Sequence, residues 1–559
     1  MKTDYKNIIA GLVVSLSLFS CVEEKKEVVG PFTDLIDFNK EILSQSGSLT
    51  KRVIQNVGVE SKTISSPNWN IELKPFLEAG FNKPANKDKY VITIDSSNLS
   101  GWKDVIYVSK DDALPVDWAI YRFVDSTCVA ASINVNRSSS AYHFKEELTY
   151  IKGSGYTINN QQELTRVDEN SFYLTGEFEN SSQPWRMFFD IGEQNIPVNF
   201  WMKNNGGHPE LTFSQGKENI KVSSIKTDSG YMAEIPIFQA YLLFEMTGEQ
   251  INGTFHNLDK GPDYVIPFSA NKLAYEQSFG YEPKEIDADF SGKWETYFYD
   301  DGDSSAAIGI FDRLGNDLIG TFATETGDYR FLQGKIMGDS FSLSTFDGSH
   351  LFLFTGKING DEITEGHFYS GAHYHATWKA NRNNNFKLID PNSMTSLKET
   401  DMKINFSFPD LNGQMVSLTD DRYNNKVVIL QIMGSWCPNC MDETRYFKEL
   451  YEKYNSKGLE IIGLGFERST DFEEASRVLN KAIADMEVPY PVLIAGTPKN
   501  SAKALPMITP IQSYPTSIFL NKQGEVEKIH TGFYGPSTGK YYDDYTNETE
   551  AFITELLSQ

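Results

Sequence analysis

Residues 427–440 read VVILQIMGSWCPNC and place two cysteines directly behind an apolar run. The run from Val427 to Leu430 predicts a buried strand. A helical pattern follows the cysteines, with apolar residues at i, i+3, i+4 and i+7, namely Phe447, Leu450, Tyr451 and Tyr454. Cys437 would then lie at a helix N-terminus, where free backbone N–H groups and the helix dipole stabilise a thiolate. Cys440 follows one turn later, so we expect it to lie close enough to form a disulfide with Cys437.

The rest of this region alternates between strand-like and helix-like patterns. Strand patterns occupy residues 427–433, 459–466, 491–495, 516–521 and 525–531, and helical patterns occupy 438–455, 472–486 and about 546–557. A turn signal at Asn412-Gly413 predicts a hairpin ahead of them. Strands that alternate with helices predict a partly parallel α/β sheet.

Residues 401–559 resemble the thioredoxin superfamily, in particular the TlpA/ResA-like thiol–disulfide oxidoreductases that are tethered in bacterial envelopes. The match includes Tyr514-Pro515-Thr516, which stands ahead of a strand in the position of the family's cis-proline. The turn at 521–524 then follows in the expected place. The resemblance implies a thioredoxin-like fold in which Trp436, Tyr514 and Pro515 line a substrate groove beside the disulfide.

Sulfur chemistry assigns different roles to the two cysteines. The attacking group must be an accessible thiolate, so Cys437 is predicted to form the mixed disulfide with a substrate. Cys440, further into the helix, is predicted to resolve that intermediate. Pro438 and Asn439 between them carry no charge, which favours a reductase or exchange role over that of a strong oxidase. The redox-active disulfide is the only cofactor that these residues require.

Resolving a mixed disulfide also needs a group that carries a proton. Thioredoxin has a buried aspartate ahead of the motif, but the equivalent position here is Gln431, which cannot titrate. Glu467, at the end of the strand 459–466, is our candidate, and a solvated Glu467 paired with Arg468 is the alternative. Asp442 and Glu443 are interpreted as surface charges that favour the first turns of the helix.

Other chemistries fit the sequence less well. A structural zinc site needs four ligands, and this domain has no second Cys-x-x-Cys or nearby His pair, so no metal is predicted. His367, His373 and His375 surround a probable turn. They are interpreted as polar residues of a solvated sheet, and a metal site is the alternative. A thiol peroxidase remains an alternative. The related peroxidases place a Pro and a Thr or Ser shortly before a single peroxidatic cysteine, and the residues Met433 to Trp436 do not form that motif.

The N-terminus predicts export. Lys2 and Lys6 precede an apolar stretch from Ile8 to Phe19, as in a signal peptide. The residues 18–21, Leu-Phe-Ser-Cys, resemble the bacterial lipoprotein box, which implies cleavage after residue 20 and lipidation of Cys21; an ordinary secretory signal is the alternative. Residues 21–30 form a polar tether. We therefore expect a lipoprotein of the Bacteroidetes type that is anchored by lipid in the cell envelope. It would lie on the periplasmic face of the outer membrane or at the cell surface.

The remaining sequence predicts a multidomain protein. Residues 31–182 are predicted to form an α+β region, with helical spacing over 31–65. Regular turn signals over 183–380 predict an antiparallel all-β barrel or sandwich, and 381–400 reads as a linker. The net charge of −25 argues against nucleic acid as a partner.

Two functional hypotheses from different classes follow. The first is an enzyme, a lipid-anchored thiol–disulfide oxidoreductase that takes electrons from an envelope donor and acts on protein disulfides. The second is a lipoprotein whose β-rich region binds a ligand or partner, with the redox domain as an accessory. Replacing Cys437 by Ser distinguishes them, because only the enzyme requires that thiol.

Overall fold

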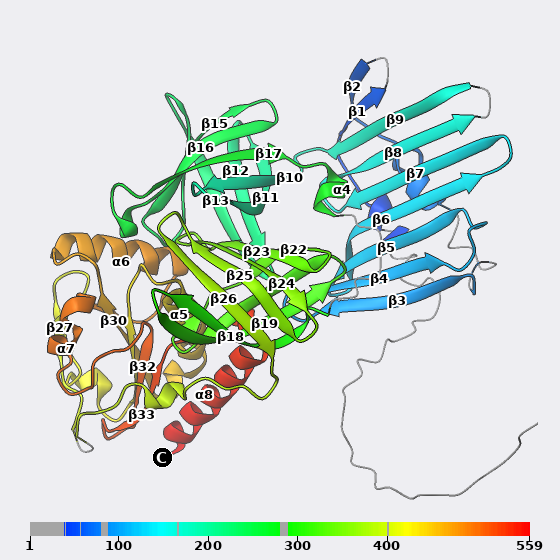
Figure 1. Ribbon diagram of the computed structural model, residues 1–559. Helices are drawn as coiled ribbons and strands as arrows, with labels where there is room; N and C mark the ends of the chain where they lie inside the picture. The colour runs from blue at the N-terminus through cyan, green and yellow to red at the C-terminus, as the bar shows by residue number, and fades with distance from the viewer. Residues whose placement is uncertain are drawn as a thin grey trace, which may run out of the picture.

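The computed structural model contains four units, which succeed one another along the chain (Figure 1). A nine-stranded sheet comes first, two closed β units follow, and a mixed sheet flanked by helices ends the chain. The structure describes residues 38–39, 41–55, 58–79, 86, 88–164, 167–279, 289–399 and 402–559.

The first unit is an antiparallel sheet in the order β2-β1-β9-β8-β7-β6-β5-β4-β3. Its strands are β1 (Leu49–Gln55), β2 (Gly58–Ile64), β3 (Tyr90–Ser97), β4 (Trp102–Ser109), β5 (Val116–Val124), β6 (Thr127–Ser138), β7 (Tyr142–Ile151), β8 (Gly155–Leu164) and β9 (Val167–Phe178). Short helical segments cover one face, among them α2 (Trp69–Glu72) and α3 (Lys74–Leu77). Phe76 of α3 packs on Tyr156, with ring centroids 5.9 Å apart.

The second unit is a closed barrel in which β17 pairs with both β16 and β10. Its strands are β10 (Gln183–Asp190), β11 (Asn195–Asn205), β12 (His208–Gln215), β13 (Glu218–Thr227), β14 (Gly230–Glu234), β15 (Ala240–Thr247), β16 (Gln250–Asn257) and β17 (Val265–Lys272), with the short helices η2 (Leu258–Lys260) and α4 (Tyr275–Ser278) beside them. Burial alternates along strands such as β12 and β17, because every second side chain points into the barrel. We call this unit the first barrel.

The third unit is a nine-stranded sheet that also closes on itself, because β19 pairs with β18 on one side and with β20 on the other. Its strands are β18 (Gly292–Asp300), β19 (Asp303–Leu314), β20 (Asp317–Thr324), β21 (Gly327–Asp328), β22 (Leu332–Met337), β23 (Ser340–Phe346), β24 (Leu351–Asn359), β25 (Glu362–Ser370) and β26 (Tyr374–Arg382). Aromatic rings fill its interior, as where Phe322 stacks on Phe354 at 4.6 Å. We call this unit the second barrel.

The fourth unit has a five-stranded sheet in the order β31-β30-β29-β32-β33, in which β29, β30 and β31 run parallel. Its strands are β29 (Val427–Met433), β30 (Leu459–Phe466), β31 (Val492–Gly496), β32 (Thr516–Leu520) and β33 (Val526–Thr531), preceded by the hairpin β27 (Ser407–Pro409) and β28 (Met415–Ser417). Its longer helices are α5 (Pro438–Tyr454), α6 (Phe472–Met486) and α8 (Lys540–Ser558), and its short helices are η3 (Pro391–Ser393), η4 (Asp421–Tyr423), η5 (Asn455–Lys457), η6 (Pro498–Asn500), α7 (Ser501–Ala504) and η7 (Pro536–Thr538). This is the thioredoxin-like arrangement that the sequence predicts.

The sheet of the fourth unit is buried on both faces. Val427 and Ile429 of β29 belong to the cluster that includes side chains of α5, α6 and α8. Val428 and Leu430 point to the opposite face and join a cluster with the hairpin and the segment after α7. The continuous apolar run of β29 therefore reflects a central strand covered on both sides.

The structure corrects two expectations about the β-rich regions. Residues 49–55, within the segment expected to be helical, form strand β1 instead. Helices and strands both occur before residue 183, as expected for an α+β region, but the nine-stranded sheet dominates it. Within 183–380, where we expected one barrel or sandwich, two closed sheets stand side by side. Turn signals locate hairpins, but they do not show which strands close a sheet, because closure depends on pairing between distant strands.

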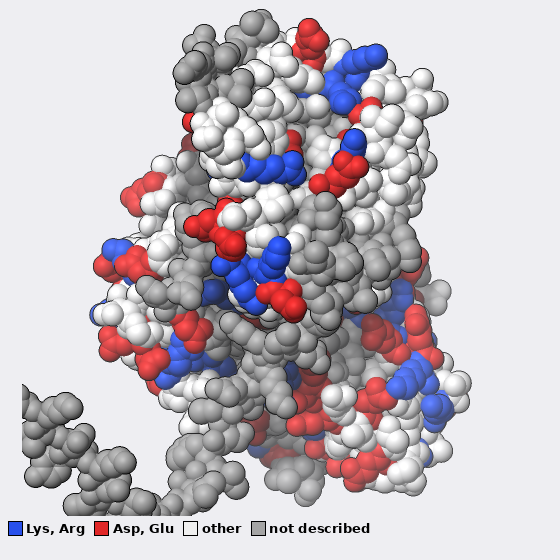
Figure 2. Space-filling view, turned by 90° about the vertical axis from the view of Figure 1, so that its right-hand side faces the viewer, with Lys and Arg blue, Asp and Glu red and all other residues white. Residues whose placement is uncertain are grey.

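Cys21 and the N-terminal signal lie outside the described residues. Among the residues that the structure describes, no helix is both long and apolar enough to cross a bilayer. Figure 2 shows acidic and basic side chains interspersed over the described part of one face of the molecule.

Candidate active site

The two cysteines of the motif form a disulfide at the start of α5, with their Cα atoms 5.2 Å apart. Cys437 is the N-cap residue of α5, and Pro438 occupies the first helical position, where a missing N–H costs nothing. The backbone N–H of Cys440 points to Cys437 Sγ at 3.2 Å. Cys437 is 6% exposed and Cys440 is 0% exposed. Cys437 is therefore the more exposed of the two cysteines.

The proline loop lies beside this disulfide. The Tyr514–Pro515 peptide bond is cis, and the carbonyl oxygen of Tyr514 lies 3.5 Å from Cys437 Sγ. The Tyr514 ring packs edge to face against Trp436, with centroids 5.4 Å apart. Trp436 is half-buried, and its indole N–H donates to the carbonyl of Phe466 at 3.0 Å. Trp436 and Tyr514 thus lie beside Cys437, and Pro515 follows Tyr514 in the same loop.

A buried carboxyl group lies one turn beyond Cys440. Glu443 is 0% exposed, which corrects its interpretation as a surface charge. Its carboxyl group accepts hydrogen bonds from Gln431 Nε2 at 3.0 Å and from Ser517 Oγ at 2.8 Å. Gln431 Nε2 also reaches the Cys440 carbonyl at 3.4 Å. Burial raises the pKa of Glu443 to about 8, so this group can hold or release a proton near neutral pH.

Glu467, our sequence-based candidate for the proton carrier, has a different environment. It is 2% exposed, so the alternative of a solvated Glu467 is wrong. Its carboxyl oxygens accept from the N–H and Oγ of Ser435, both at 2.8 Å. Burial raises the pKa of Glu467 to about 7. Because Ser435 stands two residues before Cys437, this contact holds the loop that leads to Cys437.

The second barrel covers the start of α5 with the loop between β20 and β22, which we call the cover loop (residues 325–331). Asn439 Nδ2 donates to the carbonyl of Asp328 at 3.2 Å. Arg330 donates to the carbonyl of Pro438 at 3.0 Å and forms an ion pair with Asp442 at 2.8 Å. The cover loop therefore contacts both residues that separate the cysteines.

Asp442 is also buried, which corrects its interpretation as a surface charge. It pairs with Arg330 and with Arg445, and burial raises its pKa to about 6. On the other side, Arg330 forms an ion pair with Glu218 of the first barrel. Arg330 thus joins both barrels to the thioredoxin-like domain.

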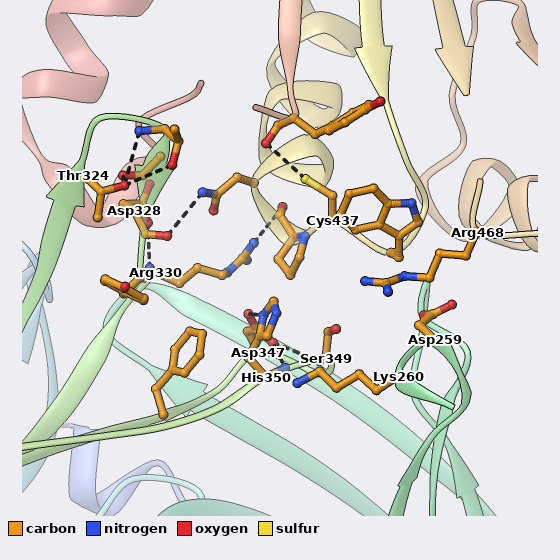
Figure 3. A pocket seen from close by; sticks show the side chains of 18 residues that line it. Asp259, Lys260, Thr324, Asp328, Arg330, Asp347, Ser349, His350, Cys437 and Arg468 are labelled. Atoms are coloured by element: carbon orange, nitrogen blue, oxygen red, sulfur yellow. Dashed lines mark hydrogen bonds and ion pairs between the residues drawn. The ribbon is translucent and has the colours of Figure 1, made fainter. Parts of the chain in front are cut away.

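These units enclose a pocket of about 280 Å³ in front of Cys437 (Figure 3). The thioredoxin-like domain contributes Trp436, Cys437, Tyr514 and Arg468 to its wall, and the first barrel contributes Asp259 and Lys260. The second barrel supplies the cover loop and the segment that carries Asp347, Ser349 and His350. Cys437 therefore faces a chamber whose opposite wall is made of β structure.

The three histidines do not gather. His367 and His375 lie on neighbouring strands, with Nδ1 and Nε2 3.1 Å apart, whereas His373 packs against Tyr264 of the first barrel at 5.6 Å. Within the described ranges, no three His, Cys, Asp or Glu side chains are grouped as metal ligands would be.

A disulfide at a helix N-terminus, beside the carbonyl of the residue that precedes a cis-proline, defines the thioredoxin-like class of thiol–disulfide oxidoreductases. Comparisons with known proteins agree. Residues 398–544 match the family model described as Redoxin. The thiol–disulfide oxidoreductase ResA of Bacillus thuringiensis subsp. konkukian is 32% identical over 136 residues, which cover 23% of this chain and 70% of that protein. ResA of Bacillus subtilis is 28% identical over 152 residues, which cover 27% of this chain and 76% of that protein.

The chain belongs to the ResA-like family of thiol–disulfide oxidoreductases, because its C-terminal domain matches members of that family. One similar solved structure is a putative thiol:disulfide interchange protein DsbE from Chlorobium tepidum. It is 22% identical, covers 29% of this chain and 99% of that chain, and has a TM-score of 0.23.

Sequence reasoning missed Glu443, although a signal for it existed. Glu443, Phe447, Leu450 and Tyr454 follow the same helical spacing, so Glu443 belongs to the buried face of α5. The pocket wall made by the two barrels had no such signal, because its residues are far from the motif in sequence.

Proposed function

We propose that this protein is a lipid-anchored envelope oxidoreductase that reduces or exchanges the disulfides of protein substrates. The observation that carries this proposal is the position of Cys437 Sγ, at the N-terminus of α5 and 3.5 Å from the Tyr514 carbonyl oxygen. A substrate strand placed along the proline loop would bring its disulfide to the more exposed sulfur. Electrons come from an envelope donor that reduces the Cys437–Cys440 disulfide.

The reaction runs in two exchange steps. The Cys437 thiolate attacks one substrate sulfur, a bond forms between them, and the substrate S–S bond breaks to release one thiolate, which takes a proton. Cys440 then loses its proton and attacks Cys437 Sγ. The Cys437–Cys440 bond forms, the mixed disulfide breaks, and the second substrate thiolate leaves and is protonated. Two electrons pass from the protein to the substrate.

Glu443 is the group that we propose to take the proton from Cys440. It lies at i+3 from Cys440, on the buried face of the same helix, and Gln431 contacts both its carboxyl group and the backbone of Cys440. A raised pKa matches this role, because the carboxyl group must exchange a proton near neutral pH. We assign Glu467 the role of positioning the loop around Ser435.

Trapping tests the proposed function. The full chain, reduced and mixed with a disulfide-containing protein such as insulin, should reduce it, and Cys437→Ser should abolish the reaction. Cys440→Ser should accumulate a mixed disulfide through Cys437 that dithiothreitol releases. Reduction by Cys437→Ser at the wild-type rate would contradict the proposal. For the anchor, Cys21→Ala should move the protein from the membrane fraction to the soluble fraction of its host cells.

A further inference from the structure

The pocket in front of Cys437 holds a buried cation without a hydrogen-bond partner. Lys260 ends the short helix η2, between strands β16 and β17 of the first barrel. Its Nζ is buried, and among the residues that the structure describes no hydrogen-bond acceptor reaches it. It lies 4.8 Å from the centre of the Tyr264 ring. A buried, unpartnered ammonium group is costly, so its presence requires an explanation.

The position of Lys260 is fixed by the second barrel. Asn257, at the start of η2, accepts a hydrogen bond from the N–H of Asp259 at 3.0 Å. The Asn257 side chain also donates to the carbonyl of Ser349 at 2.9 Å. This contact ties the loop of one barrel to the loop of the other, and it holds Lys260 at the pocket wall opposite the motif.

A second cation enters the same pocket. The guanidinium group of Arg468 lies over the Trp436 ring at 4.8 Å and reaches toward the pocket, with Lys260 entering from the barrel loop (Figure 3). No ion pair of Arg468 is found within the described part of the chain. Burial, with Arg468 adding repulsion, lowers the pKa of Lys260 to about 8, so Lys260 remains mostly protonated at neutral pH.

The other charged groups of the pocket have partners. The Asp347 carboxylate accepts hydrogen bonds from the N–H groups of Ser349 and His350 and lies 3.0 Å from His350 Nδ1. Asp259 accepts from the N–H of Gln239 at 3.3 Å. Arg330 is held by Asp442 and Glu218. Asp259 and Asp347 attract Lys260, but neither forms an ion pair with it.

We propose that this pocket selects disulfides that carry a carboxylate within a few bonds of sulfur, with Lys260 and Arg468 as its binding groups. The inference rests on the proposed function and names its substrate class. A carboxylate would give the Lys260 ammonium the acceptor it lacks while Cys437 attacks the neighbouring sulfur. The carboxylate can belong to an amino-acid disulfide or to an acidic residue beside a cysteine in a peptide. In both sources, Lys260 and Arg468 would bind the carboxylate in the same way.

Small disulfides of different charge test this selectivity. The reduced full chain, freed of reductant, is mixed with 3,3′-dithiodipropionate, neutral 2-hydroxyethyl disulfide or cationic cystamine, and the oxidation rate is followed by the loss of protein thiols. We expect dithiodipropionate to react about tenfold faster than the neutral disulfide, as a charge-assisted hydrogen bond implies. The net charge of −25 would by itself produce the opposite order.

Variants assign the effect to the pocket. Lys260→Met keeps the apolar stem and should remove the preference for dithiodipropionate over 2-hydroxyethyl disulfide. Denaturant unfolding of the variant shows whether it is folded. Arg468→Gln should reduce the preference in the same direction. Lys226→Met is the matched control, because Lys226 is exposed on β13 of the same barrel and its loss changes the net charge equally.

A peptide arm distinguishes the two sources of carboxylate. Two disulfide-linked peptides that differ only by Glu or Gln beside the cysteine are compared with the small molecules. A Lys260-dependent preference in either arm supports the inference, and the arm that shows it identifies the source. Equal rates for charged and neutral disulfides, or a preference that survives Lys260→Met, would overturn the inference alone. No reduction of any disulfide would overturn the proposed function as well.

Discussion

The thioredoxin-like domain and the second barrel contribute to the active site in different ways. The first supplies the reacting sulfurs, the cis-proline and the buried carboxyl groups, all within one small sheet and its helices. The second supplies no reacting sulfur, but its cover loop contacts Pro438 and Asn439 and closes one side of the pocket. The comparison shows that the chemistry and the access to it are encoded in separate parts of the chain.

The largest expected effect concerns the thioredoxin-like domain, which supplies the reacting groups. Glu443→Gln keeps the size of the side chain but cannot exchange a proton, so resolution of the mixed disulfide should slow by about 100-fold or more. Rapid acid quenching of the reaction, followed by separation of the mixed disulfide, measures this step. Glu467→Gln is the control and should have a smaller effect. A larger effect of Glu467→Gln than of Glu443→Gln would identify Glu467 as the proton carrier.

The difference in stability between the wild type and Glu443→Gln should also depend on pH. Between about pH 4.5 and about pH 8 the unfolded chain ionises Glu443 while the folded chain keeps it protonated, because burial raises its pKa to about 8. Wild-type stability relative to Glu443→Gln should therefore be greatest at low pH and fall by on the order of 1.4 kcal/mol per pH unit across this range. Denaturant unfolding of both proteins across this pH range measures the difference, and a difference that does not change with pH would contradict the assignment.

The next effect concerns the contact between the two regions. Arg330→Gln removes the buried cation that Asp442 and Glu218 share, and it leaves Asp442 with Arg445 alone. Stability should therefore fall by about 3–5 kcal/mol. The cover loop should also detach, and alkylation of Cys437 in the reduced protein should accelerate. Denaturant unfolding and timed alkylation measure the two results. Lys357→Met, which removes an exposed cation of the same barrel, should change neither, and an unaltered alkylation rate in Arg330→Gln would show that the loop does not limit access.

The smallest effect comes from the tip of the cover loop. Gly327 has a φ of +151°, and an added Cβ would lie 2.1 Å from Asn439 Nδ2. Gly327→Ala should therefore displace the Asn439 amide from the Asp328 carbonyl and destabilise the contact by about 1–3 kcal/mol. Gly360→Ala is the matched control, because it also has a positive φ but nothing lies within 4 Å of its Cβ. Equal alkylation rates of Cys437 in the two variants would argue against a specific role for Gly327.

The elements around the motif could be predicted because their signals are local. The strand 427–433 and the helix after it occur at the predicted residues, and the cis peptide at Pro515 is confirmed. A buried strand and an amphipathic helix are encoded by consecutive residues, so neither requires knowledge of the partner. Glu443 was interpreted as a surface residue because it is charged. Its position in the helical pattern nevertheless places it on the buried face of α5.

The sequence by itself determined the chemistry of this protein, since adjacent residues of one strand and one helix create the reactive cysteine pair. Only the tertiary structure decided what surrounds it. Lys260, Arg330 and His350 line the same pocket as Cys437 because two closed sheets fold against the thioredoxin-like domain. The pairing that closes each sheet joins strands far apart in sequence. Contacts of that kind leave no local pattern, because each depends on the packing of the whole molecule.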